Sequence, residues 1–424
     1  MLYAAPHQGR RMSKHLRING TRLNERLMEM AQIGGTPKGG VCRVALSDED
    51  KTGRDLFVQW CQAAGCKVRV DQIGNVFARR PGREPALPPI LTGSHLDSQP
   101  TGGKYDGVFG VLAALEVIET LNDEHVETRH PIEIVSWTNE EGARFAPGLT
   151  GSGVYAGEFD LQQMLLLRDK NGYSLGEELQ RIGYAGQAKP GEQTFQAAVE
   201  IHIEQGPVLE SEGITIGVVS GIQGMRWYDL VFSGQEAHAG TTPMENRRDP
   251  TAAAVQVMQR IYALNAKYAP HGRATFGDFT VKPGSRNTVP GQLTISLDYR
   301  HPDAAVLEEV DRNIRSIMEI DCQAYNIEGC VDEIWQMPPV TFAPQVVTAV
   351  KKSADQLGYR SKEMISGAGH DAMYLSQITP TGMIFVPCRD GLSHNELEFT
   401  EPADLTAGGN VLLHTILDLA NLPQ

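Results

Sequence analysis

Six side chains of the kinds that hold divalent metal ions occur in short, mostly glycine-containing segments of this 424-residue chain. They are His95, Asp106, Glu140, Glu141, His202 and His394, in the segments GSHLDS, KYDGVFG, WTNEEG, HIEQGP and LSHNE. Histidine and carboxylate together suit zinc, manganese, cobalt or nickel better than calcium or magnesium. The set is large enough for two ions and indicates a two-metal hydrolytic site.

The adjacent glutamates Glu140 and Glu141 are the sharpest local signal. They follow an apolar segment, residues 132–137, that is predicted to be a buried strand. On a strand-to-loop turn the two side chains point in different directions, so one can bind a metal while the other takes a proton from water. The alternative is a solvated acidic turn, but the strand before the pair and Gly142 after it favour catalysis.

His95 and Asp106 form a second local pattern. A neutral imidazole ligand needs a partner on its other ring nitrogen, and Asp97 could supply one. Gly107 lets the backbone bend so that the Asp106 carboxylate points into a cleft, where it could bridge two metals. Asp106 could equally cap the helix predicted from residue 107, and both roles can hold together.

Other polar residues of the same part of the chain are weak candidates on their own. His202 ends a predicted strand and His394 lies in a loop, so their weight comes only from the other ligands. The loop 367–371 (GAGHD) could cradle a carbonyl or carboxylate with its backbone N–H groups. It could equally begin a helix with Asp371 at the cap.

Arg300, at the end of an alternating strand, is a candidate for substrate binding. Its guanidinium could grip a substrate carboxylate with two hydrogen bonds, or it could be a surface arginine. His238 and Asn287 lie in the same region of the chain. Arg247 and Arg248 are expected to decorate the approach to the next helix.

The elements that position these residues alternate between strand and helix. Strands are predicted over 89–92, 132–137 and 198–203, with a nearly all-apolar helix over 107–121. Each strand delivers polar residues at its carboxyl end, and in α/β sheets ligands gather beyond those ends. The sequence therefore predicts an α/β domain whose site lies at one edge of the sheet.

The pattern changes near residue 213. Alternating strands over 214–219, 225–232, 292–300 and 329–337 and helices over 249–268 and 304–325 predict a small α+β module. We expect this module to be inserted into the larger domain. The predicted boundaries are 1–212 and 331–424 for the metal-binding domain and 213–330 for the insert.

Composition excludes several classes of protein. Apolar residues are 41% and charged residues 21%, which is typical of a globular protein, and the net charge of −14 argues against nucleic acid and anionic membranes as partners. No apolar run approaches the roughly 18 residues of a membrane span. Six scattered cysteines predict reduced thiols and a cytoplasmic location. Residues 1–14 lack the apolar core of a secretory signal and are expected to be a frayed tail.

The ordered set GSHLDSQPTGGKYDG, WTNEEGARF, HIEQGP, GQEAHAGTTPM, SRNTVPG and SGAGHDA–SHNE resembles the zinc-dependent amidases of the hydantoinase/carbamoylase family. The resemblance runs from about residue 90 to 402. It implies a mixed-sheet α/β catalytic domain of the zinc-aminopeptidase/carboxypeptidase-G type, with an inserted α+β lid that makes a homodimer. It also implies two divalent metal ions per subunit, zinc first, with manganese, cobalt or nickel as alternatives.

The resemblance also implies residue roles. His95, Asp106 and His202 would hold one metal, Asp106, Glu141 and His394 the other, and Glu140 would be the general base. The positions that match substrate-binding residues are Gln205, His238, Asn287, Arg300 and Gly369. In this family the residue matching His238 comes from the partner subunit's lid, and it stabilises the developing oxyanion.

Four interpretations of function remain at this point. The favoured one is an N-carbamoyl-L-amino acid hydrolase that releases the amino acid, carbon dioxide and ammonia. The same chemistry on allantoate or N-carbamoyl-β-alanine would use every metal ligand unchanged. Aminoacylase or dipeptidase activity is a third interpretation. A metal-stabilised binding protein that associates through its lid is the fourth, although Glu140 counts against it because a structural site needs no general base.

Overall fold

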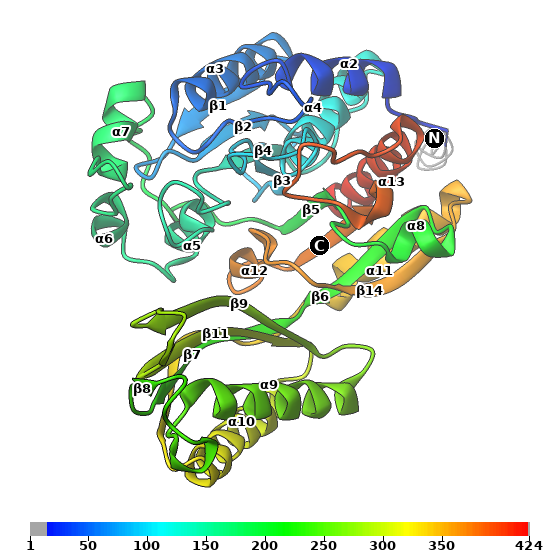
Figure 1. Ribbon diagram of the computed structural model, residues 1–424. Coiled ribbons are helices and arrows are strands. Elements are labelled where there is room, and N and C mark those ends of the chain that lie inside the picture. Colours follow the sequence, from blue (N-terminus) through cyan, green and yellow to red (C-terminus); the bar gives the residue numbers. More distant parts are fainter. Residues whose placement is uncertain (1–14, 423–424) are drawn as a thin grey trace, which may run out of the picture. The chain divides into compact units, whose positions relative to one another are not determined.

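The computed structural model describes residues 15–422, and the prediction that residues 1–14 form a frayed tail lies outside them (Figure 1). The chain folds into two compact units. One comprises the chain up to Ser220 and from Thr341 onward, and the other comprises Gly221–Val340. The first is an α/β unit with a mixed sheet and the second is an α+β unit, which are the classes predicted from the sequence.

The observed boundaries differ from the predicted insert of 213–330. Strand β6 (Ile216–Ile222) pairs with β15 (Thr381–Val386) in the large sheet, so the chain leaves the α/β unit later than predicted. Strand β12 (Glu328–Met337) pairs along its length with β7 of the small sheet, so the chain also returns later. Strand pairing, which the sequence pattern alone does not reveal, sets both boundaries.

The large sheet has the strand order β1-β2-β4-β3-β5-β15-β6-β13, with β14 paired to β6. Its other strands are β1 (Lys67–Val70), β2 (Val76–Arg80), β3 (Ile90–His95), β4 (Ile132–Trp137), β5 (Ala197–Ile203), β13 (Val340–Thr341) and β14 (Ser361–Ser366). The central strands β4, β3, β5 and β15 run parallel, and the flanking pairs β1/β2, β2/β4 and β15/β6 are antiparallel. The carboxyl ends of the four parallel strands therefore share one edge.

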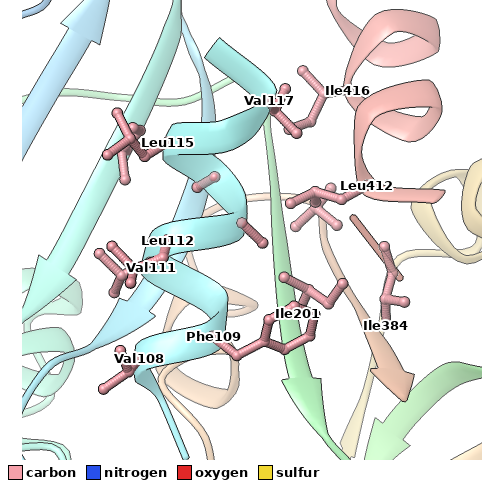
Figure 2. Packing of buried hydrophobic residues seen from close by; sticks show 14 of the residues in the cluster. Val108, Phe109, Val111, Leu112, Leu115, Val117, Ile201, Ile384, Leu412 and Ile416 are labelled. Atoms are coloured by element: carbon pink, nitrogen blue, oxygen red, sulfur yellow. The ribbon is translucent and has the colours of Figure 1, made fainter. Parts of the chain in front are cut away.

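The helices of this unit are α2 (Gly20–Met30), α3 (Asp48–Ala63), α4 (Val108–Asp123), α5 (Thr150–Ala156), α6 (Leu161–Leu165), α7 (Leu175–Ile182), α8 (Val208–Glu212), α11 (Pro344–Leu357), α12 (Ala372–Leu375) and α13 (Pro402–Ala420). Helix α4 packs on β3 and β5, and α13 packs on β5 and β15. Figure 2 shows Leu412 of α13 facing Ile201 of β5 and Ile384 of β15, with Phe109 of α4 beside them. No helix within residues 15–422 is both long enough and apolar enough to cross a lipid bilayer.

Both faces of the central strands are buried, which explains why apolar residues occupy adjacent as well as alternate positions in them. Alternate residues such as Ile90 and Ile134 belong to the main core under α4 and α13. Their neighbours Leu91 and Val135 belong to a smaller aromatic cluster on the other face, around Trp137. A strand buried on both faces is rigid, and rigid strand ends are suited to hold catalytic side chains.

The second unit is a four-stranded antiparallel sheet, in the order β12-β7-β11-β9, with two helices on one face. Its elements are β7 (Gly224–Ser233), β8 (Ala237–His238), α9 (Pro250–Asn265), β9 (Arg273–Lys282), β10 (Thr288–Val289), β11 (Gln292–His301) and α10 (Ala304–Ala324). Its core alternates along the strands, as in Leu293, Ile295 and Leu297 of β11. Helix α9 begins as predicted, with the Asp249 side chain accepting a hydrogen bond from Thr251 N and Pro250 in the first turn.

One predicted element begins elsewhere than expected, and one strand was missed. The sequence pattern predicts a helix over 55–64, but α3 begins earlier, at Asp48, because Ser47 caps it by accepting a hydrogen bond from the Asp50 N–H. Strand β9 was not predicted at all. Most of its residues are exposed and it contains Gly277 and Asp278, so it lacks the apolar alternation that marks a strand.

Leu412→Ala is predicted to lower the free energy of unfolding by about 2–5 kcal/mol, because the fully buried side chain would leave a cavity between α13 and the sheet. The measurement is the midpoint of urea denaturation followed by circular dichroism. Leu166→Ala is the matched control, since that leucine is 68% exposed and its loss should change stability by less than about 0.5 kcal/mol. Equal midpoints for the two variants would contradict the assigned core.

Candidate metal centre

The α/β unit holds five candidate metal ligands and one candidate base, Glu140. They come from the carboxyl ends of three neighbouring parallel strands and from two loops. His95 is the last residue of β3, His202 is the next-to-last residue of β5, and Glu140 and Glu141 follow β4. His95 pairs in register with Trp137, the last residue of β4. Parallel pairing therefore brings side chains more than a hundred residues apart in sequence to one edge of the sheet.

Asp106 lies at the centre of the cluster. Its Oδ1 is 3.1 Å from His202 Nε2 and 3.6 Å from His95 Nε2. Its Oδ2 is 3.4 Å from His394 Nε2, which in turn lies 3.3 Å from Glu141 Oε2. The two oxygens of one carboxylate thus face two different sets of donor atoms, His95–Asp106–His202 and Asp106–Glu141–His394.

The spacing of these donors fits metal coordination. Ligand atoms at 2.0–2.2 Å from a tetrahedral zinc ion stand roughly 3.3–3.6 Å from one another. The separations of 3.1–3.6 Å around Asp106 lie close to that range. Nitrogen and carboxylate oxygen are also the donor types that zinc, manganese, cobalt and nickel accept.

A third group of suitable spacing, Glu200, His202 and His370, is committed to other contacts. Glu200 accepts hydrogen bonds from Ser94 Oγ at 2.7 Å and from Ala372 N at 2.9 Å. His370 Nε2 lies 3.1 Å from Ser366 Oγ. This group supports the strand ends behind the centre and shares only His202 with it.

The tautomers of two histidines follow from their main-chain partners. His95 Nδ1 is 2.9 Å from the Asp97 carbonyl oxygen, and His202 Nδ1 is 2.9 Å from the Ile203 carbonyl oxygen. A carbonyl only accepts, so each Nδ1 carries a proton, and each Nε2 faces Asp106. Burial lowers the pKa of His95 to about 4, which keeps its ring neutral near pH 7.

Asp97 acts differently from the prediction. Its main-chain carbonyl, and not its carboxylate, bonds His95, and the nearest carboxylate oxygen lies 3.8 Å from Nδ1. The carboxylate instead accepts the N–H groups of Glu140 and Glu141, each at 3.3 Å. The side chain thus bonds the neighbouring loop, while the main chain of the same residue bonds the imidazole.

Glu140 and Glu141 occupy different positions, as a division of roles requires. Glu140 Oε2 lies 3.4 Å from His95 Nε2, whereas Glu141 faces His394. Gln99 Nε2 donates to Glu141 Oε2 at 2.8 Å, a contact with no local sequence signal. Burial raises the pKa of both glutamates well above the usual value, and crowding with other carboxylates adds to it. Divalent cations between such carboxylates would reverse this effect.

The loop that carries the glutamates is fixed by Asn139. This buried residue has a left-handed backbone (φ 55°), and its amide nitrogen donates to Phe145 O at 2.7 Å and Thr150 Oγ1 at 2.8 Å. Leu149 N donates to the Glu140 carbonyl at 2.7 Å. These hydrogen bonds join the two ends of the turn. The only sequence signal for the turn is that asparagine tolerates positive φ.

Gly107 allows the close approach of Asp106 to the histidines. Its φ is +65°, and a Cβ atom there would lie 2.3 Å from His95 Cε1. Asp106 does not cap the helix with its side chain: Gly107 is the cap residue and α4 starts at Val108. The carboxylate is therefore left for the cluster, and of the two roles considered for it the capping one is wrong.

Asp106 is also held by a polar network around Gln205. Gln205 Nε2 donates to Asp106 Oδ2 and to Ser393 Oγ, both at 3.0 Å. Ser393 Oγ lies 2.9 Å from an oxygen of Glu398, whose other oxygen accepts the Tyr105 N–H at 2.9 Å. Sequence patterns did not single out Ser393 or Glu398, because no local motif links them to a residue near position 105.

The loop 367–371 lies in the same unit. A Cβ atom on Gly369 would be 3.7 Å from Leu149 Cδ1, so this loop faces the turn that carries the glutamates. Helix α12 begins directly after this loop with Asp371 at its N-cap position, as the second alternative predicted, although the Asp371 side chain makes no capping hydrogen bond. His370 is buried against Phe385 and His202.

The remaining candidates, His238, Asn287 and Arg300, lie in the second unit. His238 pairs with Thr288 across the β8/β10 ladder, and Ala239 N donates to the Asn287 carbonyl at 2.9 Å, so His238 and Asn287 are neighbours. Arg300 lies on β11 and pairs with Asp298 at 2.7 Å.

Arg247 was expected to be a surface residue before α9, but it makes specific main-chain hydrogen bonds. Its guanidinium donates to the Ala239 carbonyl at 2.7 Å and to the Thr242 carbonyl at 3.1 Å. It therefore bridges the two ends of the loop that follows His238. The carbonyl acceptors carry no residue-type signature, so the sequence could not indicate this role.

Comparison with known proteins identifies the family. The model of the peptidase family M20/M25/M40 matches residues 91–418. An N-carbamoyl-L-amino-acid amidohydrolase of Rhizobium meliloti is 42% identical over 99% of this chain and 100% of its own length. An allantoate amidohydrolase of Bacillus subtilis is 34% identical over 92% of this chain and 95% of its own length.

A solved structure gives the same result. The crystal structure of an amidase of the hydantoinase/carbamoylase family from Burkholderia multivorans superposes with a TM-score of 0.93 at 52% identity, covering 96% of this chain and all of that one. This chain therefore belongs to the M20/M25/M40 peptidase family and, within it, to the amidases of the hydantoinase/carbamoylase family.

Proposed function

We propose that this protein is a two-metal amidohydrolase that cleaves the ureido C–N bond of N-carbamoyl-L-amino acids. The observation that carries the proposal is Asp106, whose two carboxylate oxygens face separate donor sets while Glu140 stands 3.4 Å from His95. The relatives named N-carbamoyl-L-amino-acid amidohydrolase, which match nearly the whole chain, support the choice of substrate.

Two divalent metal ions per subunit, zinc or alternatively manganese, cobalt or nickel, suit the donor atoms. His95, Asp106 and His202 would hold one ion, and Asp106, Glu141 and His394 the other. Ions at these positions supply Lewis acidity, polarising the substrate carbonyl and lowering the pKa of a water molecule. The Nδ1–H bonds of His95 and His202 to main-chain carbonyls pre-orient both rings for this purpose.

Glu140 acts as the proton carrier. It takes a proton from the attacking water and returns it to the nitrogen of the amino acid as that nitrogen leaves. The carbamic acid formed in the same step decomposes to carbon dioxide and ammonia. The Asn139 side chain and the Leu149 N–H hydrogen-bond the turn that carries Glu140. The Glu140 carboxyl is therefore held at one position through both proton transfers.

The substrate-binding residues proposed are Gln205 and Gly369 of the α/β unit and His238, Asn287 and Arg300 of the second unit. His238 Nδ1 accepts the N–H groups of Gly240 and Thr241, so the neutral ring carries its proton on Nε2. That N–H is a donor for the carbonyl oxygen, where negative charge develops. Arg300 offers the planar fork that pairs with a carboxylate.

The second unit, Gly221–Val340, is proposed to serve as a lid and as the surface of a homodimer. Exposed apolar side chains on α9, α10 and β12, namely Tyr262, Ile320 and Ile334, support an interface there. A monomer mass by sedimentation velocity at micromolar concentration would contradict it.

Six free thiols support a cytoplasmic location.

A second candidate is allantoate amidohydrolase activity, which is favoured by the relatives of that name at 34% identity. Allantoate is also a ureido acid with a carboxylate, so the metal ligands, Glu140 and Arg300 would keep their roles. N-carbamoyl-β-alanine differs by one methylene between the ureido nitrogen and the carboxylate. Only the match between pocket and substrate separates these activities.

The experiment that tests the proposal is product release by zinc-loaded enzyme from four substrates. They are N-carbamoyl-L-methionine, allantoate, N-carbamoyl-β-alanine and N-acetyl-L-methionine, with ammonia and methionine both measured. The highest kcat/KM is expected for N-carbamoyl-L-methionine. A higher kcat/KM for allantoate or N-carbamoyl-β-alanine would move the protein to that substrate, and turnover of the acetyl compound alone would contradict ureido chemistry.

Glu140→Gln is predicted to lower kcat by about 10²–10⁴-fold, because the amide cannot accept the proton of water. Its metal content, measured by inductively coupled plasma mass spectrometry, should stay at the wild-type value. Glu141→Gln is the matched control, since it removes a proposed metal ligand and should lower metal content as well. Wild-type kcat in Glu140→Gln would refute its role as general base.

Arg300→Met is predicted to lower kcat/KM for N-carbamoyl-L-methionine by roughly 10²-fold or more, through loss of the carboxylate pair. The same variant should hydrolyse N-carbamoyl-L-methionine amide, which has no carboxylate, as well as the wild type does. Arg312→Met, an exposed arginine of α10, serves as the control. Equal losses on the acid and the amide would rule out carboxylate recognition by Arg300.

A further inference from the structure

Glu398 is a buried carboxylate that reaches both loops from which the centre takes ligands. It lies in the same unit as the metal ligands and is only 2% exposed. Its Oε1 accepts the main-chain N–H groups of Tyr105 at 2.9 Å and Asp106 at 3.1 Å. Its Oε2 accepts from Ser393 Oγ at 2.9 Å. One side chain therefore holds the peptide of Asp106 and the residue that precedes His394.

Ser393 extends this contact to the Asp106 side chain. Ser393 Oγ lies 3.1 Å from Asp106 Oδ2 and accepts from Gln205 Nε2 at 3.0 Å. Oδ2 is the oxygen of Asp106 that faces His394 and Glu141 rather than His95 and His202. The network thus converges on one half of the centre.

That half is the one that needs external support. His95 and His202 lie in strands buried on both faces, and each ring is fixed by a main-chain carbonyl. His394 lies in a loop, its side chain is 53% exposed, and its backbone is left-handed (φ 53°), which is rare for a residue with a side chain. Its position depends on what holds the loop around it.

The sequence makes room for Glu398 at a second point. A Cβ atom on Gly103 would lie 2.0 Å from Glu398 Cδ and 2.5 Å from its Cβ. Glu398 therefore passes directly over a glycine of the GGKYDG segment on its way to Tyr105. Glycine at position 103 and glutamate at position 398 are parts of one arrangement.

We propose that Glu398 is the positioning residue of the second metal half-site, holding Asp106 and the His394 loop at the separation that a metal ion requires. The inference rests on the proposed two-metal function and deepens it. Glu398 touches neither substrate nor reacting atoms; it acts through Asp106 and Ser393. Removal of such an outer partner typically weakens metal affinity by about 10–100-fold.

The test is a zinc titration of metal-free protein against a chromophoric chelator. Wild type is expected to bind two ions per chain, and Glu398→Asp, which is one methylene too short to reach both loops, should bind the second about 10–100-fold more weakly with the first unchanged. Glu398→Gln should stay within a few-fold of wild type. Its amide oxygen can still accept both N–H groups while its nitrogen donates to Ser393 Oγ.

Two further variants separate positioning from general damage. Gly103→Ala should reproduce the selective loss, because the added methyl displaces Glu398 without changing any polar group. Glu396→Asp is the matched control: it shortens a carboxylate of the same loop that faces Lys38 Nζ at 3.6 Å, and both affinities should be unchanged. The Gly103 variant also keeps the test open should Glu398→Asp fail to fold.

Three results would overturn the inference. They are an unchanged second affinity in Glu398→Asp and Gly103→Ala, an equal loss at both ions, or a loss in Glu398→Gln as large as in Glu398→Asp. Fewer than two ions bound by the wild type would instead contradict the proposed two-metal function, so the two failures are distinguishable.

Discussion

The arrangement of this α/β unit depends on one carboxylate, that of Asp106, serving two sets of donors at once. Its two oxygens face His202 and His95 on one side and His394 on the other. Buried carboxylates repel one another strongly at low dielectric, so this geometry is stable only if cations or hydrogen-bond donors surround it. Gln205 supplies such a donor to Asp106, and the main-chain N–H groups of Tyr105 and Asp106 supply donors to the neighbouring carboxylate of Glu398.

Unusual backbone conformations occur where the chain must deliver these side chains. Gly107, Asn139, Gln205 and His394 all have positive φ angles, and each is, or is adjacent to, a residue of the candidate site. A left-handed residue costs free energy unless the surroundings fix it. At Asn139 the hydrogen bonds of the side-chain amide hold the backbone in this conformation. At Gly107 the absence of a side chain removes the steric penalty of a positive φ. The strands provide rigidity, whereas these turns set the direction of the side chains of the candidate site.

Residue type and strand pattern were enough to predict the α/β class and the polar residues at the sheet edge, because β3, β4 and β5 are mostly apolar and polar residues lie at or just beyond their carboxyl ends. The exposed strand β9 and the exact unit boundaries were beyond reach, since sheet pairing and not local pattern decides them. The same holds for Gln99 and Glu398. Each makes its decisive contact with a residue far away in sequence, and glutamine and glutamate are ordinary surface residues.

Support for the centre also comes from residues that precede the part of the chain matched by the family model. Arg43 is fully buried and donates to the carbonyl of Leu96, between His95 and Asp97. Burial raises the pKa of Asp97 to about 7, Asp50 adds to the rise, and Arg54 opposes it. Asp97 accepts the N–H groups of Glu140 and Glu141, and a carboxylate accepts best when it is ionised. Arg43, between α2 and α3, therefore holds the main chain beside Asp97, and Arg54 of α3 acts on the Asp97 carboxylate that bonds the loop carrying Glu140. The α/β unit works as one electrostatic assembly rather than as a scaffold with a separate site.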